Sequence, residues 1–176
     1  MRTRNFCAAL AAALLAACST PAARAPATVA AQVELRRFMG DWFVIASIPT
    51  FLEKGAHNAV ERYRLDGDGT VAVNFTFNAG GFDGPLKTYT PRGFVLDATN
   101  ALWGMRFVWP IKADYRISYI ASDYSLTVIG REARDYVWIM ARTPTIPDAE
   151  YRRMVEFVTR EGYDVSKLEL VPHQPR

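Results

Sequence analysis

The sequence predicts an all-β domain of eight antiparallel strands, followed by one helix. Segments in which apolar and polar residues alternate recur between residues 42 and 142, and this period of two is typical of strands with one buried face. Short turns separate the segments, and Asp66-Gly67-Asp68-Gly69 is a strong hairpin signal. One stretch near the C-terminus repeats its apolar residues at helical spacing. By their length and spacing, the strands form a meander that closes into a barrel or a sandwich.

The first predicted strand begins at Trp42 and stops before Pro49. The fourth is interrupted by Pro91 and Gly93, which indicates a bulge or an edge. In the last strand both faces are apolar, so both need cover. The predicted strands are residues 42–48, 59–65, 70–78, 88–97, 101–110, 114–121, 125–130 and 135–142.

A helix is the expected cover for the outer face of the last strand. Thr145 is the candidate N-cap, Pro147 lies in the first turn where its missing N–H is harmless, and Gly162 ends the helix. A short strand over residues 168–171 then returns to the sheet. The apolar stripe of the helix consists of Tyr151, Met154, Val155 and Val158.

Trp42 follows a Gly-Asp turn and opens an apolar segment, so we expect its ring to close one end of the core. Arg142 ends the last predicted strand. If the first and last strands are antiparallel neighbours, the guanidinium reaches the Trp42 ring in a cation–π contact worth about 0.5 to 2 kcal/mol. The alternative for each residue alone is an ordinary core tryptophan and an ordinary surface charge.

The N-terminus resembles the signal peptide of a bacterial lipoprotein. Arg2 and Arg4 precede an apolar run over residues 6–17, which is shorter than the roughly 20 residues of a spanning helix. The run ends in Leu15-Ala16-Ala17-Cys18, which resembles the lipobox whose cysteine is acylated. The alternative is a soluble secreted protein with a chance cysteine. We expect a signal peptide over residues 1–17, lipidated Cys18 and a flexible tether over residues 18–34, and one domain over residues 35–176.

Processing at Cys18 changes what the composition permits. Cys7 is removed and Cys18 carries the anchor, so no free thiol remains for a disulfide, a metal or a nucleophile. Loss of Arg2 and Arg4 lowers the 21 basic residues to 19 against 18 acidic residues. The high isoelectric point therefore does not indicate nucleic acid binding. His57 and His173 are the two histidines of the chain, and no metal site is expected.

Three short motifs resemble those of lipocalins. Gly40-Asp41-Trp42 is similar to their G-x-W motif, Ser122-Asp123-Tyr124 to their T-D-Y motif, and Arg142 to their single arginine. Residues 53–55, 135–145 and 162–168 also resemble segments of bacterial outer-membrane lipocalins, relatives of apolipoprotein D. The resemblance covers residues 35–173. It departs at Ser122, where the family usually has threonine, and in the absence of a cysteine pair.

This resemblance implies an eight-stranded antiparallel up-and-down lipocalin barrel with one C-terminal helix packed on its outside. Such a barrel has room for one small ligand, and the resemblance implies binding of fatty acids, lysophospholipids or similar molecules for membrane maintenance, without a cofactor. It also implies attachment to the outer membrane, facing the periplasm. The expected motif residues are Gly40, Trp42, Asp123, Tyr124 and Arg142, and the expected ligand-binding residues are Phe75, Phe77, Trp103, Met105, Phe107, Tyr115, Tyr119 and Trp138.

Three alternatives stay open at the level of the sequence. A lipid-modifying, isomerase-type enzyme could use a carboxylate inside the barrel, from Asp83, Asp114 or Glu61. A filled barrel could instead act as an interaction module, and an apolar rim could pair two barrels into a homodimer. The cations that could meet a lipid head group are better explained as solvated surface, and they are Arg62, Lys87, Arg92, Arg106 and Arg116.

Overall fold

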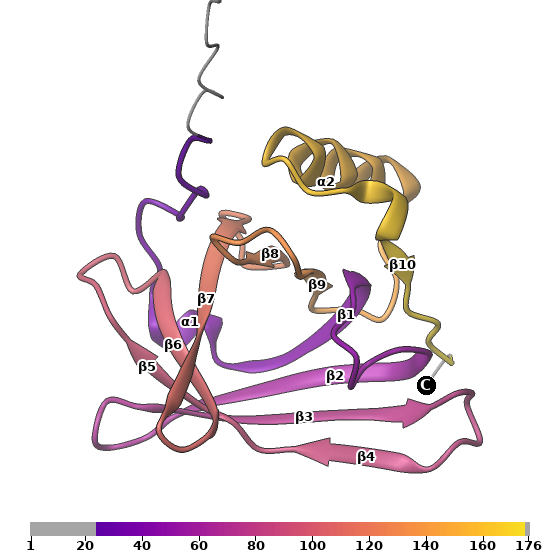
Figure 1. The fold of residues 1–176 in the computed structure, drawn as a ribbon, viewed down its shortest axis with the longest axis horizontal. Helices are drawn as coiled ribbons and strands as arrows, with labels where there is room; N and C mark the ends of the chain where they lie inside the picture. The colour runs from indigo at the N-terminus through magenta and orange to yellow at the C-terminus, as the bar shows by residue number, and fades with distance from the viewer. Residues whose placement is uncertain (1–23, 175–176) are drawn as a thin grey trace, which may run out of the picture.

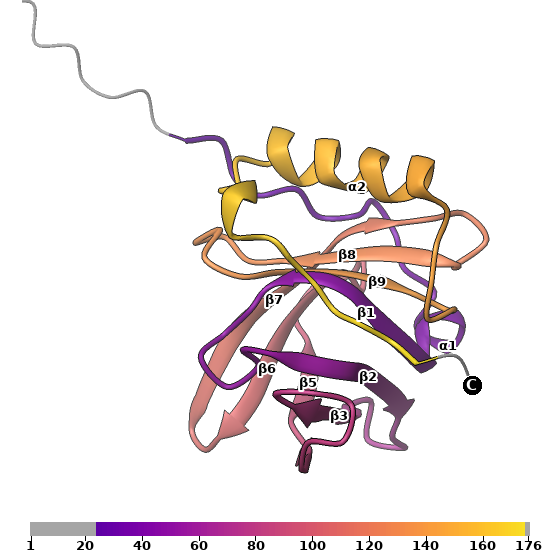
Figure 2. The same ribbon diagram turned by 90° about the vertical axis from the view of Figure 1, so that its right-hand side faces the viewer.

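The computed structural model describes residues 24–174, which form a closed antiparallel barrel with one helix on its outside. Figures 1 and 2 show the fold in two views at right angles: β2 and β3 lie in the plane of Figure 1, and β8 and β9 lie in the plane of Figure 2. Pairing of β1 with β9 closes the ring, in which β4 and β5 form one interrupted strand. The ring strands are β1 (Gly40–Ile48), β2 (Ala56–Leu65), β3 (Val71–Ala79), β4 (Leu86–Tyr89), β5 (Arg92–Val95), β6 (Leu102–Val108), β7 (Ile111–Ile120), β8 (Leu126–Gly130) and β9 (Val137–Ala141).

The eight-stranded barrel confirms the predicted fold class. The predicted break at Pro91 is the junction of β4 and β5, because proline has no N–H to give to the ladder. The short C-terminal strand is also confirmed: β10 (Glu169–Leu170) pairs with β1 outside the ring. Alternation places Tyr63, Val73 and Tyr115 in the inner core, whereas Val128, Ile139 and Ala141 belong to an outer cluster.

One end of the barrel is closed by aromatic side chains. The short helix α1 (Leu35–Phe38), which the sequence did not predict, places Phe38 against the Trp42 ring at a centroid distance of 5.1 Å. Tyr63 and Trp103 pack against Phe38 at 5.3 and 5.5 Å. Trp42 is fully buried, and its indole N–H donates to the Phe38 carbonyl at 2.8 Å. The predicted closure of the core by Trp42 is therefore confirmed.

The helix α2 (Asp148–Arg160) covers the outer face of β8 and β9. Met154 and Val158 are buried in the outer cluster, as the apolar stripe predicts. The predicted N-cap is wrong: Pro147 holds that position, and no side chain caps the helix. Acidic residues in the first turn compensate, because negative charge is favourable at a helix N-terminus. Gly162, at φ +86°, follows the helix end and confirms the predicted stop.

Residues 24–33 form a strap along the outside of the barrel, beside β7 (Figures 1 and 2). The Ala30 N–H donates to the Ile117 carbonyl and the Val33 N–H to the Thr99 carbonyl, both at 2.8 Å. Val33 is fully buried and Ala27 nearly so. The flexible tether predicted as far as residue 34 is therefore wrong for the strap, because these buried side chains and paired backbone groups hold it to the fold. Cys18 and the predicted signal peptide lie outside the described residues.

Candidate functional site

A cavity of about 200 Å³ lies at the end of the barrel opposite Trp42. The loop between β1 and β2 borders it through Phe51, Leu52 and Glu53, and strands β2, β3, β6 and β7 supply its walls. Trp42 is the cross-strand neighbour of Glu61, so Glu61 lies just above the aromatic closure and forms part of the cavity floor. Most of the lining is apolar, which favours a hydrophobic ligand.

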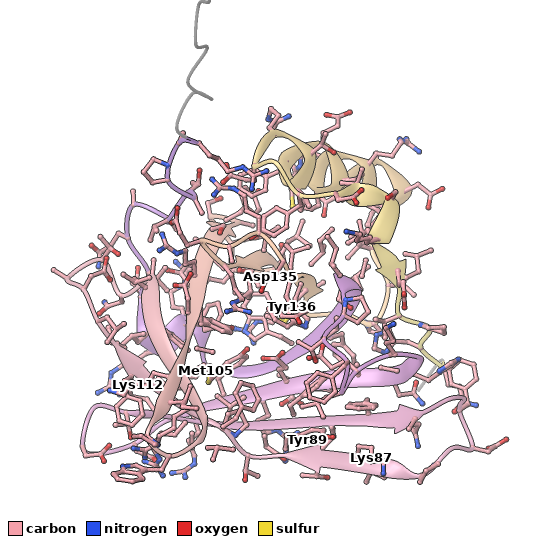
Figure 3. The ribbon with its side chains drawn as sticks, in the orientation of Figure 1. Lys87, Tyr89, Met105, Lys112, Asp135 and Tyr136 are labelled. Atoms are coloured by element: carbon pink, nitrogen blue, oxygen red, sulfur yellow. The ribbon has the colours of Figure 1, made fainter. Side chains whose placement is uncertain are left out.

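The structure brings together five of the predicted ligand-binding residues at the cavity. Figure 3 labels Met105 on β6 and Tyr136, which precedes β9, and both line the cavity from different walls. Phe107 lines the mouth and is 56% exposed, whereas the other four are largely or wholly removed from solvent. The predicted residues that line the cavity are Phe75, Met105, Phe107, Tyr115 and Trp138.

Three predicted ligand-binding residues do not line the cavity. Trp103 belongs to the aromatic closure, where its ring stacks on Tyr115 at 5.3 Å. Phe77 is buried in the inner core, with its ring 6.1 Å from that of Tyr89 on β4. Tyr119 lies outside the barrel, with its ring 5.6 Å from Phe157 of α2. The register shifts between Ile117 and Tyr119, and a bulge of this kind reverses the alternation that placed Tyr119 inside.

The predicted contact between Arg142 and Trp42 is confirmed. The guanidinium carbon lies 3.7 Å from the ring centroid, and β1 and β9 are antiparallel neighbours. Gly40, the first residue of that motif, has φ +94°, a conformation in which a side chain is strained. The motif therefore builds the closed end of the barrel.

Asp123 and Tyr124 form the turn between β7 and β8 at the same end. The Asp123 carboxylate accepts from the Ser125 N–H at 3.0 Å, and Tyr124 has φ +63°. The Tyr124 hydroxyl accepts from the Glu34 N–H at 2.8 Å, which attaches α1 to this turn. These residues lie away from the cavity and position the closure.

Two carboxyl groups face the cavity, of which Glu61 is buried and Glu53 is half-buried. Burial raises the pKa of Glu61 to about 7, while a hydrogen bond from Tyr63 lowers it and the charge of Glu53 raises it. Burial also raises the pKa of Glu53, although the Trp138 indole donates to its carboxylate at 2.7 Å. The Tyr63 and Tyr115 hydroxyl oxygens lie 2.6 Å apart, and burial raises the pKa of both phenols.

Of the three carboxylates considered for an enzyme, two line the cavity and one does not. Glu61 and Asp114 line the cavity, whereas Asp83 lies in the loop between β3 and β4 and does not. Asp114 is paired with Arg116 at 3.0 Å. Among residues 24–174, no group of three or more histidine, cysteine or acidic residues is placed to hold a metal ion.

A family model also matches the part of the chain that forms the barrel. Residues 33–173 match the family model described as a lipocalin-like domain. The chain is a lipocalin. The matched residues include the G-x-W closure and the arginine on its tryptophan.

Two relatives of this lipocalin are similar in sequence over most of their length. Temperature-induced lipocalin-1 of Arabidopsis thaliana is 34% identical over 147 residues, covering 80% of this chain and 79% of the relative. Outer membrane lipoprotein Blc of Escherichia coli K12 is 32% identical over 163 residues, covering 92% and 91%. Among solved structures, the cockroach allergen Per a 4 superposes with a TM-score of 0.63 at 17% identity, covering 84% of this chain and 92% of that one.

Arg131 is one of the cavity residues that sequence reasoning missed, and it is the only cation among them. It follows β8, contacts the Asp135 carboxylate at 3.0 Å, and has a buried Nε without a hydrogen-bond partner. None of the five cations considered for a head group lines the cavity of the lipocalin, and Arg62 and Arg92 are paired with Asp41 and Asp66. In the sequence, Arg131 is marked only by its position in a predicted turn. That pattern alone does not distinguish a cavity residue from an exposed surface arginine.

Proposed function

We propose that this lipocalin binds a small hydrophobic molecule in its barrel cavity and carries or stores it beside a membrane. The observation that supports this proposal is the mainly apolar cavity of about 200 Å³ at the open end. A barrel filled by its own side chains, acting as an interaction module, would lack such a space. The proposal is for a binding protein and not for an enzyme.

A slim, single-chain lipid suits a cavity of this size. Burial of each CH₂ group stabilises a complex by about 0.8 kcal/mol, and several kcal/mol are lost through ordering of the ligand. An acyl chain therefore binds without a charged anchor. Fatty acids, lysophospholipids or similar small hydrophobic molecules are the ligand classes that we propose, with membrane maintenance as their use.

We propose that Cys18 is acylated and holds the protein on the outer membrane, facing the periplasm. The similarity to the E. coli outer membrane lipoprotein supports this location. No helix among residues 24–174 is long and apolar enough to cross a membrane. The sequence has five residues between Cys18 and Arg24, so Arg24 would lie within roughly 20 Å of the acylated residue.

The strap would place the anchor near the cavity mouth. The Ala25 carbonyl accepts from Arg134 at 2.7 Å, and the Ala27 N–H donates to Glu132. Both partners belong to the turn between β8 and β9, which begins with the cavity residue Arg131. The described chain therefore starts at the open end, and an anchor a few residues upstream would turn the mouth toward the bilayer.

The rim of the mouth carries exposed apolar side chains. Phe51 is 80% exposed on the loop between β1 and β2, and Trp109 is 78% exposed at the turn between β6 and β7. Val108 and Ile111 flank Trp109 and are also exposed. Such a patch favours contact with lipid, so this rim supports direct exchange of ligand with a bilayer.

The test uses the full chain carrying Cys18→Ser, so that no attached acyl group competes for the cavity. The purified protein is extracted with organic solvent for mass spectrometry and titrated with the neutral fluorescent probe N-phenyl-1-naphthylamine. Saturable, one-to-one probe binding, with or without a co-purified lipid, supports a carrier. No probe binding and no extracted lipid would contradict the proposal and favour a filled interaction module.

A further inference from the structure

A carboxyl group and two phenols meet at the floor of the cavity. Glu61 is 9% exposed, Tyr115 is 6% exposed, and both line the cavity, with Tyr63 behind them. The Tyr63 hydroxyl donates to the Glu61 carboxylate, and the Tyr63 and Tyr115 oxygens lie 2.6 Å apart. Among the described residues, the side chains of the motifs that close the barrel make no hydrogen bond to this cluster. An apolar ligand end would leave the remaining lone pairs of the cluster without a hydrogen-bond partner.

The protons of this cluster determine what it offers to a ligand. A hydroxyl carries one proton and two lone pairs. Because the Tyr63 hydroxyl donates its hydrogen bond to Glu61, the Tyr115 hydroxyl must be the donor in the hydrogen bond between the two phenols. The groups left facing the cavity are the lone pairs of Tyr115 and the second carboxylate oxygen of Glu61. With Glu61 ionised, the floor contains only acceptors.

The other charged groups that line the cavity are mainly acidic, which also favours a ligand that donates hydrogen bonds. Trp42 and Phe75, the cross-strand neighbours of Glu61, contribute no charge. The single cation of the lining, Arg131, is paired with Asp135 through Nη1 and keeps an unpartnered Nε, but it follows β8 at the open end and lies away from the floor. Arg142 lies beyond Trp42. Apart from Glu61 and Tyr63, the titratable groups from the surrounding elements are Glu53, Asp114, Tyr115, Arg131 and Tyr136.

We infer that the floor formed by Glu61 and Tyr115 binds the hydrogen-bond-donating end of an amphiphile, a hydroxyl or an ammonium group, and discriminates against a free carboxylate. This inference rests on the proposed function and narrows its ligand class. The ligand enters with its polar end first, and its apolar chain fills the space between the floor and the rim. An ionised fatty acid brings only acceptors and a negative charge to this floor, so it binds poorly or with its tail inward.

Protonation of Glu61 reverses the preference of the floor for hydrogen-bond donors over a carboxylate. The neutral carboxyl group donates through its own proton, so it accepts a carbonyl or a carboxylate as a partner. Since burial raises the pKa of Glu61 to about 7, both forms are accessible near neutral pH. Affinity for an amine therefore rises with pH, affinity for a carboxylate falls, and affinity for an alcohol changes least.

The experiment measures displacement of N-phenyl-1-naphthylamine from the full-length Cys18→Ser protein by decylamine, decan-1-ol and decanoate. At about pH 5.5 and about pH 8.5 the amine stays protonated and the acid stays mostly ionised in solution, so changes with pH report on the protein. We expect decylamine to bind at least about tenfold tighter than decanoate at the higher pH, as for a hydrogen bond to a charged group. We expect this gap to narrow at the lower pH.

Two variants assign the discrimination to the floor. Glu61→Gln keeps an acceptor for Tyr63 and removes the charge, so the gap should fall below about threefold. The matched control is Glu156→Gln on the exposed face of α2, which should keep the full gap. Tyr115→Phe keeps the ring on Trp103 and should weaken decylamine and decan-1-ol severalfold, which provides an independent test if Glu61→Gln does not fold.

The outcomes separate this inference from the proposed function. Equal affinities for the three ligands would overturn the inference and leave the carrier function standing. A gap that persists in Glu61→Gln would also overturn it, because the mouth groups Glu53 and Asp114 would then cause the discrimination. Failure of the probe itself to bind would overturn both.

Discussion

The guanidinium of Arg142 lies 3.7 Å above the Trp42 ring and also donates to the carbonyl oxygens of Arg37, Phe38 and Asp41, at 2.8, 3.0 and 2.7 Å. These carbonyls surround the C-terminal end of α1, where a cation is favourable. One side chain from β9 therefore joins the short helix, the first strand and the indole ring. This joint closes the barrel opposite the cavity.

Trp42→Ala should lower the free energy of unfolding by about 3 to 5 kcal/mol, because it removes a fully buried aromatic side chain and the contact with Arg142. Urea denaturation followed by circular dichroism measures the change. Trp109→Ala is the control, since Trp109 is 78% exposed and should have little effect on stability. Equal stability of the two variants would contradict the role of Trp42 in the closure.

Phe75→Ala and Tyr119→Ala distinguish the inside of the barrel from the outside. Phe75 lines the cavity, so its truncation should weaken probe binding by at least about tenfold. Tyr119 packs under α2, so its truncation should lower stability by about 2 to 4 kcal/mol without changing the affinity for the probe. Fluorescence titration and urea denaturation measure the two effects. Weaker probe binding by folded Tyr119→Ala would contradict its place outside.

The raised pKa of Glu61 should make stability depend on pH. The folded state, with a pKa of about 7, binds more protons than the unfolded chain between about pH 4.5 and pH 7. The free energy of unfolding should therefore fall by about 3 kcal/mol as pH rises through this range. Urea denaturation at several pH values measures it. Glu61→Gln should remove the part of this loss that Glu61 causes and leave the smaller part due to Glu53, whose pKa burial also raises. An unchanged slope would contradict the burial of Glu61.

Cys18→Ser should release the protein from the membrane fraction. Without the thiol no acyl chain can be attached. The apolar rim alone binds a bilayer more weakly than acyl chains, whose buried CH₂ groups each contribute about 0.8 kcal/mol. Fractionation of expressing cells, followed by immunoblotting, measures the distribution. Cys7→Ser is the matched control and should stay with the membranes. Membrane residence of Cys18→Ser would contradict anchoring by lipidation.

Replacement of the apolar rim should weaken contact with lipid vesicles. The double variant Phe51→Ser, Trp109→Ser in the Cys18→Ser protein should reduce co-sedimentation with phosphatidylethanolamine–phosphatidylglycerol vesicles by at least about tenfold, since burial of two such side chains contributes a few kcal/mol. Leu96→Ser is the control, because Leu96 is 55% exposed but lies at the closed end. Equal losses in the two proteins would show that the mouth does not face the membrane.

The fold was predictable from the sequence because its strands keep one periodicity over most of their length. Alternation marked the inward faces of β3 and β6, and Pro91 marked the break between β4 and β5. The doubly apolar β9 required a cover, and α2 supplies it. The contact of Arg142 with Trp42 followed from pairing the first and last strands.

The remaining parts depend on events that periodicity does not record. A register shift before Tyr119 turned that side chain outward, and no residue type in β7 announces it. The strap is held by backbone hydrogen bonds of Ala30 and Val33, which an Ala- and Pro-rich segment does not reveal. The floor of the cavity required Tyr63 and Tyr115, 52 positions apart, to meet at Glu61.

The break at Pro91 leaves a short free edge along β4. Closed barrels leave no strand edge on which another chain can pair, but β4 pairs only with β3 among the described strands. Pro85 and Pro91 stand just outside its two ends, and Lys87 adds a charge to it. Each of these features opposes growth of a foreign strand along the edge. The free edge of β4 therefore brings little added tendency to aggregate.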